Sequence, residues 1–211
     1  MVARTVATDL GPLPRFGDRR RISVGLLGGS FNPAHPGHRH VAELATRHLR
    51  LDQVWFLVSP GNPLKPARGM APLAERLDSA RRIADDRRIV ASGIEAAFGT
   101  TYTVDTLRVL LRRFPRIRFV WVMGADLLAQ LPRWRRWKDI VHRLAFVVLP
   151  RPGYTYQALA GQAAHRLGHV RRRTREAPVI AGNAPGWVFL PARQTALSST
   201  AIRAAGKGNV P

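Results

Sequence analysis

The stretch VGLLGGSFNPAHPGHRHVAELA, Val24 to Ala45, places three histidines where an apolar strand gives way to a helix. The apolar run ends in Gly28 and Gly29, which are expected to let the backbone turn sharply and approach a ligand closely. From Pro36 onward, apolar residues recur at helical spacing. The stretch therefore predicts a strand, a tight turn and a helix whose N-terminus favours an anion.

His35 and His38 bracket a Pro-Gly pair and are spaced to face the same anion. The turn lacks the Gly-Lys-Ser/Thr of a P-loop and the G-x-G-x-x-G fingerprint of dinucleotide folds. A metal site that adds His40 is an alternative, but no carboxylate lies nearby in sequence to complete it. Histidines that merely cap a turn or pack are another alternative, which we favour for His40. For the pair, phosphate binding is the favoured interpretation.

Composition indicates an ordinary globular chain of 211 residues, with 45% hydrophobic and 22% charged residues. No apolar run approaches the roughly 18 residues that a membrane span needs. Cysteine is absent, which excludes disulfides and thiolate metal sites. The formal net charge is +21, but the arginines are scattered along the chain. A solvated, Arg-rich surface that attracts phosphorylated substrates is favoured over dedicated nucleic-acid binding.

Residues 1–20 are basic and contain no apolar segment of the kind found in secretory signals. We expect them to form a poorly ordered extension, with an organelle-targeting peptide as the alternative. Residues 21–211 are expected to form a single domain. Without an export signal, the expected location is the cytoplasm. The sequence leaves the oligomeric state open.

Strand and helix patterns alternate along the chain. This alternation predicts an α/β fold, a Rossmann-like doubly wound parallel sheet with helices on both faces. Such sheets bind ligands beyond the carboxyl ends of their strands. The predicted strands are 21–29, 53–60, 88–95, 117–124, 144–153 and 187–192, and the predicted helices begin at Pro36 and cover 72–86, 103–114 and 197–206.

GGSFNPAHPGH resembles the signature of the nucleotidyltransferase superfamily, which is His or Thr, any residue, Gly, His. Further segments occur in the order and spacing of bacterial nicotinate-nucleotide adenylyltransferases, so that the resemblance covers 22–205. These segments are NPLKP, TYTVDTL, GADLLAQLPRWRRW, RPG and LSSTAIR. One departure is Asn32, where Asp is commoner in the family, and we expect little effect from it.

The resemblance implies a nucleotidyltransferase-type fold and a reaction of NAD biosynthesis. In that reaction ATP and nicotinate mononucleotide give deamido-NAD and pyrophosphate. His35 and His38 are the implied catalytic residues, and Mg²⁺, held mainly by the ATP phosphates, is the expected cofactor. Residues expected to bind ATP and its phosphates are Gly28, Gly29, Ser30, Phe31, Lys65, Gly124, Asp126, Ser199, Thr200 and Arg203.

The pyridine nucleotide is expected to contact Thr103, Asp105 and Trp134, with the Trp face stacked on the ring. As alternatives, Thr103 only caps the helix that follows, and Asp105 only favours the positive end of that helix. The acid form of the substrate is expected over the amide. Arginines on both sides of Trp134 agree with that choice; they are Arg133, Arg135 and Arg136.

Three other functions compete with this interpretation. A sister adenylyl- or cytidylyltransferase, such as pantetheine-phosphate adenylyltransferase, shares the histidine turn but is not expected to have a tryptophan at the position of Trp134, after GADLL. A basic nucleic-acid-binding protein without catalysis predicts salt-sensitive binding and no pyrophosphate release. A metal-dependent hydrolase predicts stoichiometric zinc on the three histidines.

Overall fold

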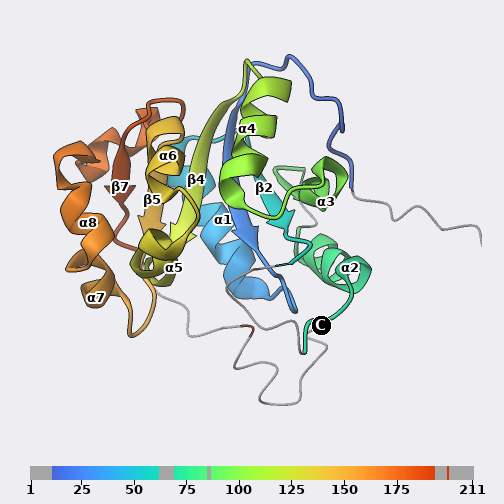
Figure 1. Ribbon diagram of the computed structural model, residues 1–211, viewed down its shortest axis with the longest axis horizontal. Helices are drawn as coiled ribbons and strands as arrows, with labels where there is room; N and C mark the ends of the chain where they lie inside the picture. The colour runs from blue at the N-terminus through green and yellow to red at the C-terminus, as the bar shows by residue number, and fades with distance from the viewer. Residues whose placement is uncertain (1–10, 62–68, 85–86, 193–198, 200–211) are drawn as a thin grey trace, which may run out of the picture.

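The computed structural model describes residues 11–61, 69–84, 87–192 and 199. Over these residues the chain forms one seven-stranded parallel sheet with the order β3-β2-β1-β4-β5-β7-β6 (Figure 1). The predicted α/β architecture is therefore confirmed. The strands are β1 Ser23–Gly29, β2 Gln53–Val58, β3 Ile89–Ser92, β4 Arg118–Gly124, β5 Phe146–Leu149, β6 Arg171–Arg172 and β7 Trp187–Phe189.

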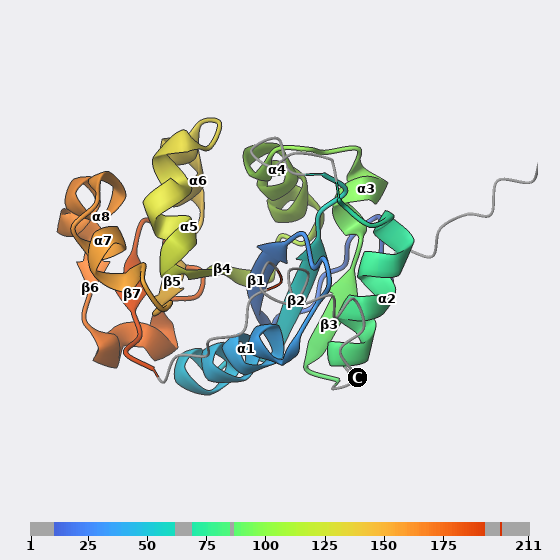
Figure 2. The same cartoon turned by 90° about the horizontal axis from the view of Figure 1, so that it is seen from below.

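Helices cover both faces of the sheet, with α1 on one face and α4, α5 and α6 on the other (Figure 2). The α-helices are α1 Pro36–Leu49, α2 Leu73–Ile83, α3 Ile94–Phe98, α4 Thr103–Arg113, α5 Ala125–Gln130, α6 Trp137–Arg143, α7 Thr155–Leu159 and α8 Gln162–Arg166. Three short 3₁₀ helices are η1 Leu131–Arg133, η2 Gly168–Val170 and η3 Thr174–Val179. The helix predicted over 197–206 lies, apart from Ser199, outside the described residues.

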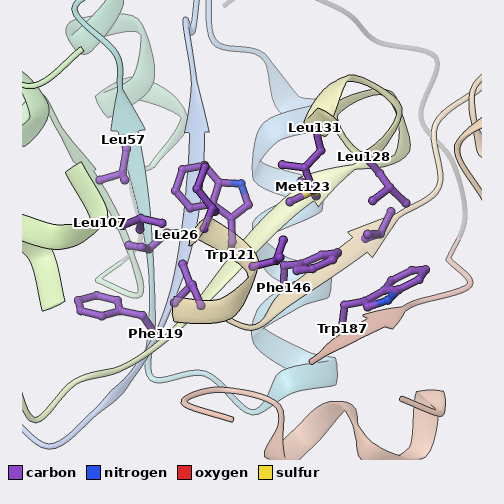
Figure 3. Packing of buried hydrophobic residues seen from close by; sticks show 14 of the residues in the cluster. Leu26, Leu57, Leu107, Phe119, Trp121, Met123, Leu128, Leu131, Phe146 and Trp187 are labelled. Atoms are coloured by element: carbon purple, nitrogen blue, oxygen red, sulfur yellow. The ribbon is translucent and has the colours of Figure 1, made fainter. Parts of the chain in front are cut away.

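Two hydrophobic clusters fill the space between the sheet and its helices. Successive residues of a strand point to opposite faces, so Leu26 enters one cluster and Leu27 the other. The first cluster contains several aromatic side chains, among which the rings of Phe146 and Trp187 stack with their centroids 5.6 Å apart (Figure 3). No helix among the described residues is long and apolar enough to cross a membrane.

The strand predicted over 88–95 is wrong at its end, because Ile94 and Glu95 belong to α3. The hydroxyl of Ser92 accepts a hydrogen bond from the backbone N–H of Ile94 at 3.2 Å, which turns the chain out of the sheet. Gly99, at φ 65°, ends the short helix in the left-handed region.

Residues 11–21 run alongside the end of α4. Leu13 packs against the first cluster, and the guanidinium of Arg113 donates a hydrogen bond to the carbonyl of Arg15. Gly17 has a φ of 87°, and a Cβ there would lie 1.9 Å from the carbonyl oxygen of Arg113. Only glycine therefore fits this crossing.

The strand order reverses between β1 and β4, which are neighbours in the sheet. The chain leaves β1 toward α1 on one face and leaves β4 toward α5 on the other. In doubly wound sheets this divergence opens a crevice at the carboxyl ends of the two strands. The candidate site is built around it.

Candidate active site

The turn after β1 is shaped by Phe31 rather than by the two glycines. Phe31 has a φ of 48°, and its buried ring stacks on Phe56 with centroids 5.1 Å apart. Gly28 and Gly29 lie within β1, and neither has a positive φ. A Cβ on Gly28 would lie 2.9 Å from the indole of Trp121. The expectation that these glycines turn the chain is therefore wrong, and Gly28 instead makes room for a neighbouring ring.

Asn32 connects the same turn to the start of the segment before α2. Its side-chain nitrogen donates to the carbonyl of Gly69 at 2.9 Å, and its side-chain oxygen accepts from the N–H of Ala71 at 3.3 Å. An aspartate carboxylate can only accept. The departure from the commoner Asp therefore has a structural use, which the sequence reading missed.

His35 and His38 lie together at the start of α1, with ring centroids 4.0 Å apart. The Nδ1 atom of His38 accepts a hydrogen bond from the backbone N–H of His35 at 3.2 Å. A nitrogen that accepts carries no proton, so Nε2 of His38 is the N–H donor. The ring of Phe31 packs 4.7 Å from that of His38 and fixes its plane.

His35 is buried, with 1% of its surface exposed, and its Nδ1 has no hydrogen-bond partner among the described residues. Burial lowers the pKa of His35 from 6.5 to about 4, and the positive charge of Arg151 adds to the effect. The imidazole is therefore neutral at pH 7. It can bind an anion as a hydrogen-bond donor, but not as a cation.

The ends of β4 and β5 supply a second group of side chains. Arg151, just after β5, places its Nε 3.7 Å from Oδ1 of Asp126, in the first turn of α5. A Cβ on Gly124 would lie 2.4 Å from that carboxylate oxygen and 2.9 Å from Arg151. A residue with a Cβ therefore does not fit at position 124, because the side chains of Asp126 and Arg151 lie too close. The sequence analysis singled out the RPG segment, which begins at Arg151, but assigned that arginine no role in the site.

Some buried polar atoms near the carboxyl ends of β1 and β4 have no hydrogen-bond partner within the part of the chain that the structure describes. Among the described residues, four buried side-chain atoms lack a hydrogen-bond partner. They are Oγ of Ser30, Nδ1 of His35, Oδ1 of Asp126 and Nε1 of Trp121. The first three follow the ends of β1 and β4. Because buried polar groups are normally paired, three such atoms at the ends of two neighbouring strands indicate a ligand site.

A pocket adjoins this group between α1 and the end of β5. Its lining is mostly apolar, with Arg151 at one side. His40, which we set aside as a packing residue, belongs to it. The lining residues are His40, Val41, Leu44, Leu149, Pro150, Arg151 and Ala192.

Ser199, far along the chain, lies beside the turn after β1. Its hydroxyl donates to the carbonyl of Pro33 at 2.9 Å, across 166 residues of sequence. Of the other residues expected at the phosphates, Lys65, Thr200 and Arg203 lie outside the described residues.

The start of α4 carries the residues expected to contact the pyridine. Thr103 is the first helical residue and makes no capping hydrogen bond through its side chain, because Tyr102 occupies the capping position. The capping alternative for Thr103 is therefore wrong. Asp105 pairs with Arg108 at 2.9 Å and lies 3.9 Å from Arg135. Its carboxylate is engaged by two arginines of the protein.

Arg135 and Trp134 belong to the segment between η1 and α6. The guanidinium of Arg135 lies 4.7 Å from the centre of the exposed Tyr102 ring, which ties this segment to the start of α4. The half-buried ring of Trp134 meets Trp121 edge to face, with centroids 6.2 Å apart. Arg136 pairs with Asp139. Two of the three arginines expected to favour a carboxylate thus have partners within the protein.

A buried carboxyl group, that of Glu95, lies next to the residues that lead into α4. Glu95 in α3 accepts a hydrogen bond from the hydroxyl of Thr106 at 2.9 Å, and that hydroxyl lies 2.8 Å from Thr100. Burial raises the pKa of Glu95 to about 7, against the opposing effect of the Thr106 bond. This network fixes the residues that lead into α4.

Metal coordination by the protein alone finds no support in the described part of the chain. Nowhere in it do three His, Cys, Asp or Glu side chains gather as a possible metal site. The three-histidine site considered from the sequence is therefore not formed, although His35, His38 and His40 all lie within that part.

The chain is similar to known proteins in both sequence and fold. The cytidylyltransferase-like family model matches residues 26–205. A probable nicotinate-nucleotide adenylyltransferase from Gluconobacter oxydans is 57% identical over 189 residues, which are 88% of this chain and 96% of the relative. One from Gluconacetobacter diazotrophicus is 54% identical over 196 residues, covering 92% of this chain and 91% of the relative.

Among solved structures, the Plasmodium falciparum nicotinic acid mononucleotide adenylyltransferase complexed with NaAD shares the fold. The TM-score is 0.66 at 16% identity, over 87% of this chain and 83% of that one. The same enzyme complexed with APC gives a TM-score of 0.64, at the same identity and coverage. The family match and the bacterial relatives show that the chain belongs to the cytidylyltransferase-like family and, within it, to the nicotinate-nucleotide adenylyltransferases.

Proposed function

We propose that this chain transfers the adenylyl group of ATP to nicotinate mononucleotide, forming deamido-NAD and releasing pyrophosphate. Membership of the nicotinate-nucleotide adenylyltransferases carries the proposal. The crevice between β1 and β4 supports it, since the unsatisfied polar atoms of Ser30, His35 and Asp126 lie there. A nucleotide is a ligand of the polarity that these atoms require.

The chemistry needs no general base. The phosphate of the mononucleotide has a second pKa of about 6 and is mostly ionised at pH 7. One of its oxygens attacks the α-phosphorus of ATP, and the bond from that phosphorus to the pyrophosphate oxygen breaks with its electron pair. The protein aligns the two nucleotides and stabilises the charge that builds on the phosphates. A neutral His35 suits this role.

The phosphate donors come from the turn and from the start of α1. Nε2–H of His38 donates to the phosphates, together with the backbone N–H groups of Ser30 and Phe31. The positive end of the 14-residue helix α1 adds to the attraction. We assign Lys65, Ser199, Thr200 and Arg203 to the same anion, with Ser199 already held beside the turn through Pro33.

Nucleotidyltransferases of this kind generally use a divalent metal. We propose Mg²⁺, held mainly by the ATP phosphates rather than by a cage of protein ligands. Oδ1 of Asp126 makes no hydrogen bond within the described residues and lies 3.7 Å from Nε of Arg151, so this carboxylate is the one we assign next to such an ion. When bound, the ion neutralises charge on the phosphates.

The adenine ring of ATP and the pyridine ring of the mononucleotide bind at different parts of the site. We assign the adenosine of ATP to the segment from Gly124 to Asp126 at the end of β4, beside Arg151. The pyridine stacks on Trp134, near Thr103. Asp105 supports this side indirectly, by holding Arg135 against the start of α4. We expect the acid form of the mononucleotide to be preferred over the amide.

The test is pyrophosphate release from ATP and Mg²⁺ with three acceptors in parallel. Release with nicotinate mononucleotide, and little with nicotinamide mononucleotide or phosphopantetheine, is the expected result. Equal use of the amide would overturn the acid preference alone. Release only with phosphopantetheine would make the chain a sister enzyme. Salt-sensitive RNA binding without any release would favour the nucleic-acid alternative.

A further inference from the structure

Arg76, in the first turn of α2, carries a buried guanidinium that clamps the ends of two strands. It is 2% exposed. Its Nη1 donates to the carbonyl oxygens of Ser30 and Ser59, both at 2.7 Å. Its Nε donates to Ala71 at 2.8 Å and its Nη2 to Pro60 at 3.3 Å. One side chain thus joins the turn after β1, the turn after β2 and the entry to α2.

The charge of this guanidinium has no carboxylate partner among the described residues. Its neighbour Glu75 is exposed, and Asp78 pairs with Arg81 at 3.1 Å. Burial lowers the pKa of Arg76, but an arginine remains charged at neutral pH. Buried charges are normally paired, and four carbonyl dipoles compensate a full charge only in part. An anion close to the turn would complete the compensation.

The hydrogen bond from Arg76 to Ser30 also orients a backbone donor, the N–H of Phe31. The carbonyl of Ser30 and the N–H of Phe31 belong to one peptide unit, and in a trans peptide these two groups point in opposite directions. Because the carbonyl points at Arg76, the N–H of Phe31 points away from it. The Oγ of Ser30, buried without a partner, belongs to the same turn.

We propose that Arg76 is a positioning residue for the ATP phosphates. It holds the turn after β1 so that the Phe31 N–H faces the anion, and its buried charge strengthens the attraction from behind the turn. The inference rests on the proposed function, because it takes the anion to be the triphosphate. The inference assigns a role to Arg76, which itself touches no substrate. That role has two parts, the positive charge of the guanidinium and the orientation of the Phe31 N–H.

Two substitutions separate these contributions. Arg76→Lys keeps the positive charge but cannot reproduce the planar fork that reaches four carbonyls. Arg76→Gln loses both. Arg82→Gln, on an exposed position of the same helix, is the matched control for lost charge. For each variant we would measure the dissociation constant of a non-hydrolysable ATP analogue, kcat, and the midpoint of thermal unfolding.

The Gln variant should bind the analogue about tenfold more weakly, the size of one lost charge-assisted contact, with Arg82→Gln unchanged. The Lys variant should bind within about threefold of wild type but turn over about tenfold more slowly, because the Phe31 N–H is no longer aimed. Equal affinity losses in the two variants would overturn the charge role. A Lys variant with wild-type kcat would overturn the aiming role, and this readout stands even if the Gln variant does not fold.

Analogue binding does not require the pyridine substrate. If wild-type protein binds the analogue but releases no pyrophosphate with nicotinate mononucleotide, the proposed function fails and the Arg76 comparison can still be made. If both variants bind the analogue as wild type does and only unfold at lower temperature, Arg76 is purely structural and the inference is wrong.

Discussion

The backbone N–H of His35 donates to Nδ1 of His38, so the start of α1 selects the tautomer of its own histidine. The proton of His38 is placed on Nε2 before any substrate arrives. Such a donor costs no reorganisation when charge develops on the phosphates. The two histidines therefore act as a unit in which one residue's main chain prepares the other's side chain.

His38→Asn tests this arrangement. The Asn oxygen can accept the His35 N–H as Nδ1 does, but nothing replaces the Nε2 donor. We expect kcat to fall by about 10²–10³, the effect of losing one preorganised donor, with an unchanged circular dichroism spectrum. His48→Asn, on the exposed last turn of α1, is the control. Near-wild-type turnover in His38→Asn would remove His38 from the phosphate site.

His35 should make the protein sensitive to mild acid. Its pKa is about 4 in the folded protein and 6.5 when unfolded, so the unfolded chain binds more protons between these values. Stability should therefore fall as the pH drops from about 6.5 to 4. Urea unfolding at several pH values should show a shallower fall for His35→Gln, which cannot titrate. Parallel curves for variant and wild type would contradict the neutral, buried state of His35.

Glu95 should act with the opposite sign. Its pKa is about 7 in the folded protein against 4.5 unfolded, so the folded protein binds the extra proton between these values. The stability linked to this group is complete below pH 4.5 and is lost as the pH rises to 7. Glu95→Gln keeps an acceptor for Thr106 and should gain stability relative to wild type from pH 5 to pH 8. Glu75→Gln, exposed on α2, should show no such trend.

Asn32→Asp should weaken the link between the turn and the segment before α2. The variant loses the donor to Gly69 and sets a carboxylate oxygen against that carbonyl. We expect a loss of about 1–3 kcal/mol in the free energy of unfolding, typical of an unsatisfied buried group. KM for ATP should also rise, since the same turn holds the phosphate donors. A variant as stable as wild type would contradict the two-way amide contact.

Gly28→Ala should be destabilising for a steric reason. The new Cβ would lie 2.9 Å from the indole of Trp121, and overpacking of this kind costs about 1–3 kcal/mol. Trp121→Phe removes the part of the ring that blocks the methyl group. The double variant should therefore be more stable than the sum of the two single changes predicts. Additive effects in chemical denaturation would refute the clash.

The sequence predicted the sheet well because strand and helix periodicities are local signals. It failed where tertiary contacts decide. Phe31 adopts a left-handed backbone that local preference assigns to glycine, because stacking on Phe56 holds its ring. The end of β3 was misplaced because Ile94 suits a strand as well as a helix, and the Ser92 hydroxyl turns the chain.

The histidine pair was accessible to sequence reasoning because both members lie within one short motif. Arg76 was missed because it resembles Arg81 and Arg82 of the same arginine-rich helix. Its spacing, three residues after Leu73 and four before Ala80, puts it on the apolar face and was the available signal. Arg151 and Asp126 meet only because β4 and β5 are adjacent, which pattern alone does not specify.

The hydrogen bond from Ser199 to Pro33 bears on how the protein matures during synthesis. Residue 33 leaves the ribosome long before residue 199, and β1 must also wait for β4 before its second edge is paired. Contacts across such separations form late. The nascent chain therefore carries its histidine motif through most of translation without the Ser199 hydroxyl that hydrogen-bonds to Pro33. A chain interrupted before Ser199 can complete its seven strands and still lack the hydrogen bond that joins Ser199 to the turn after β1.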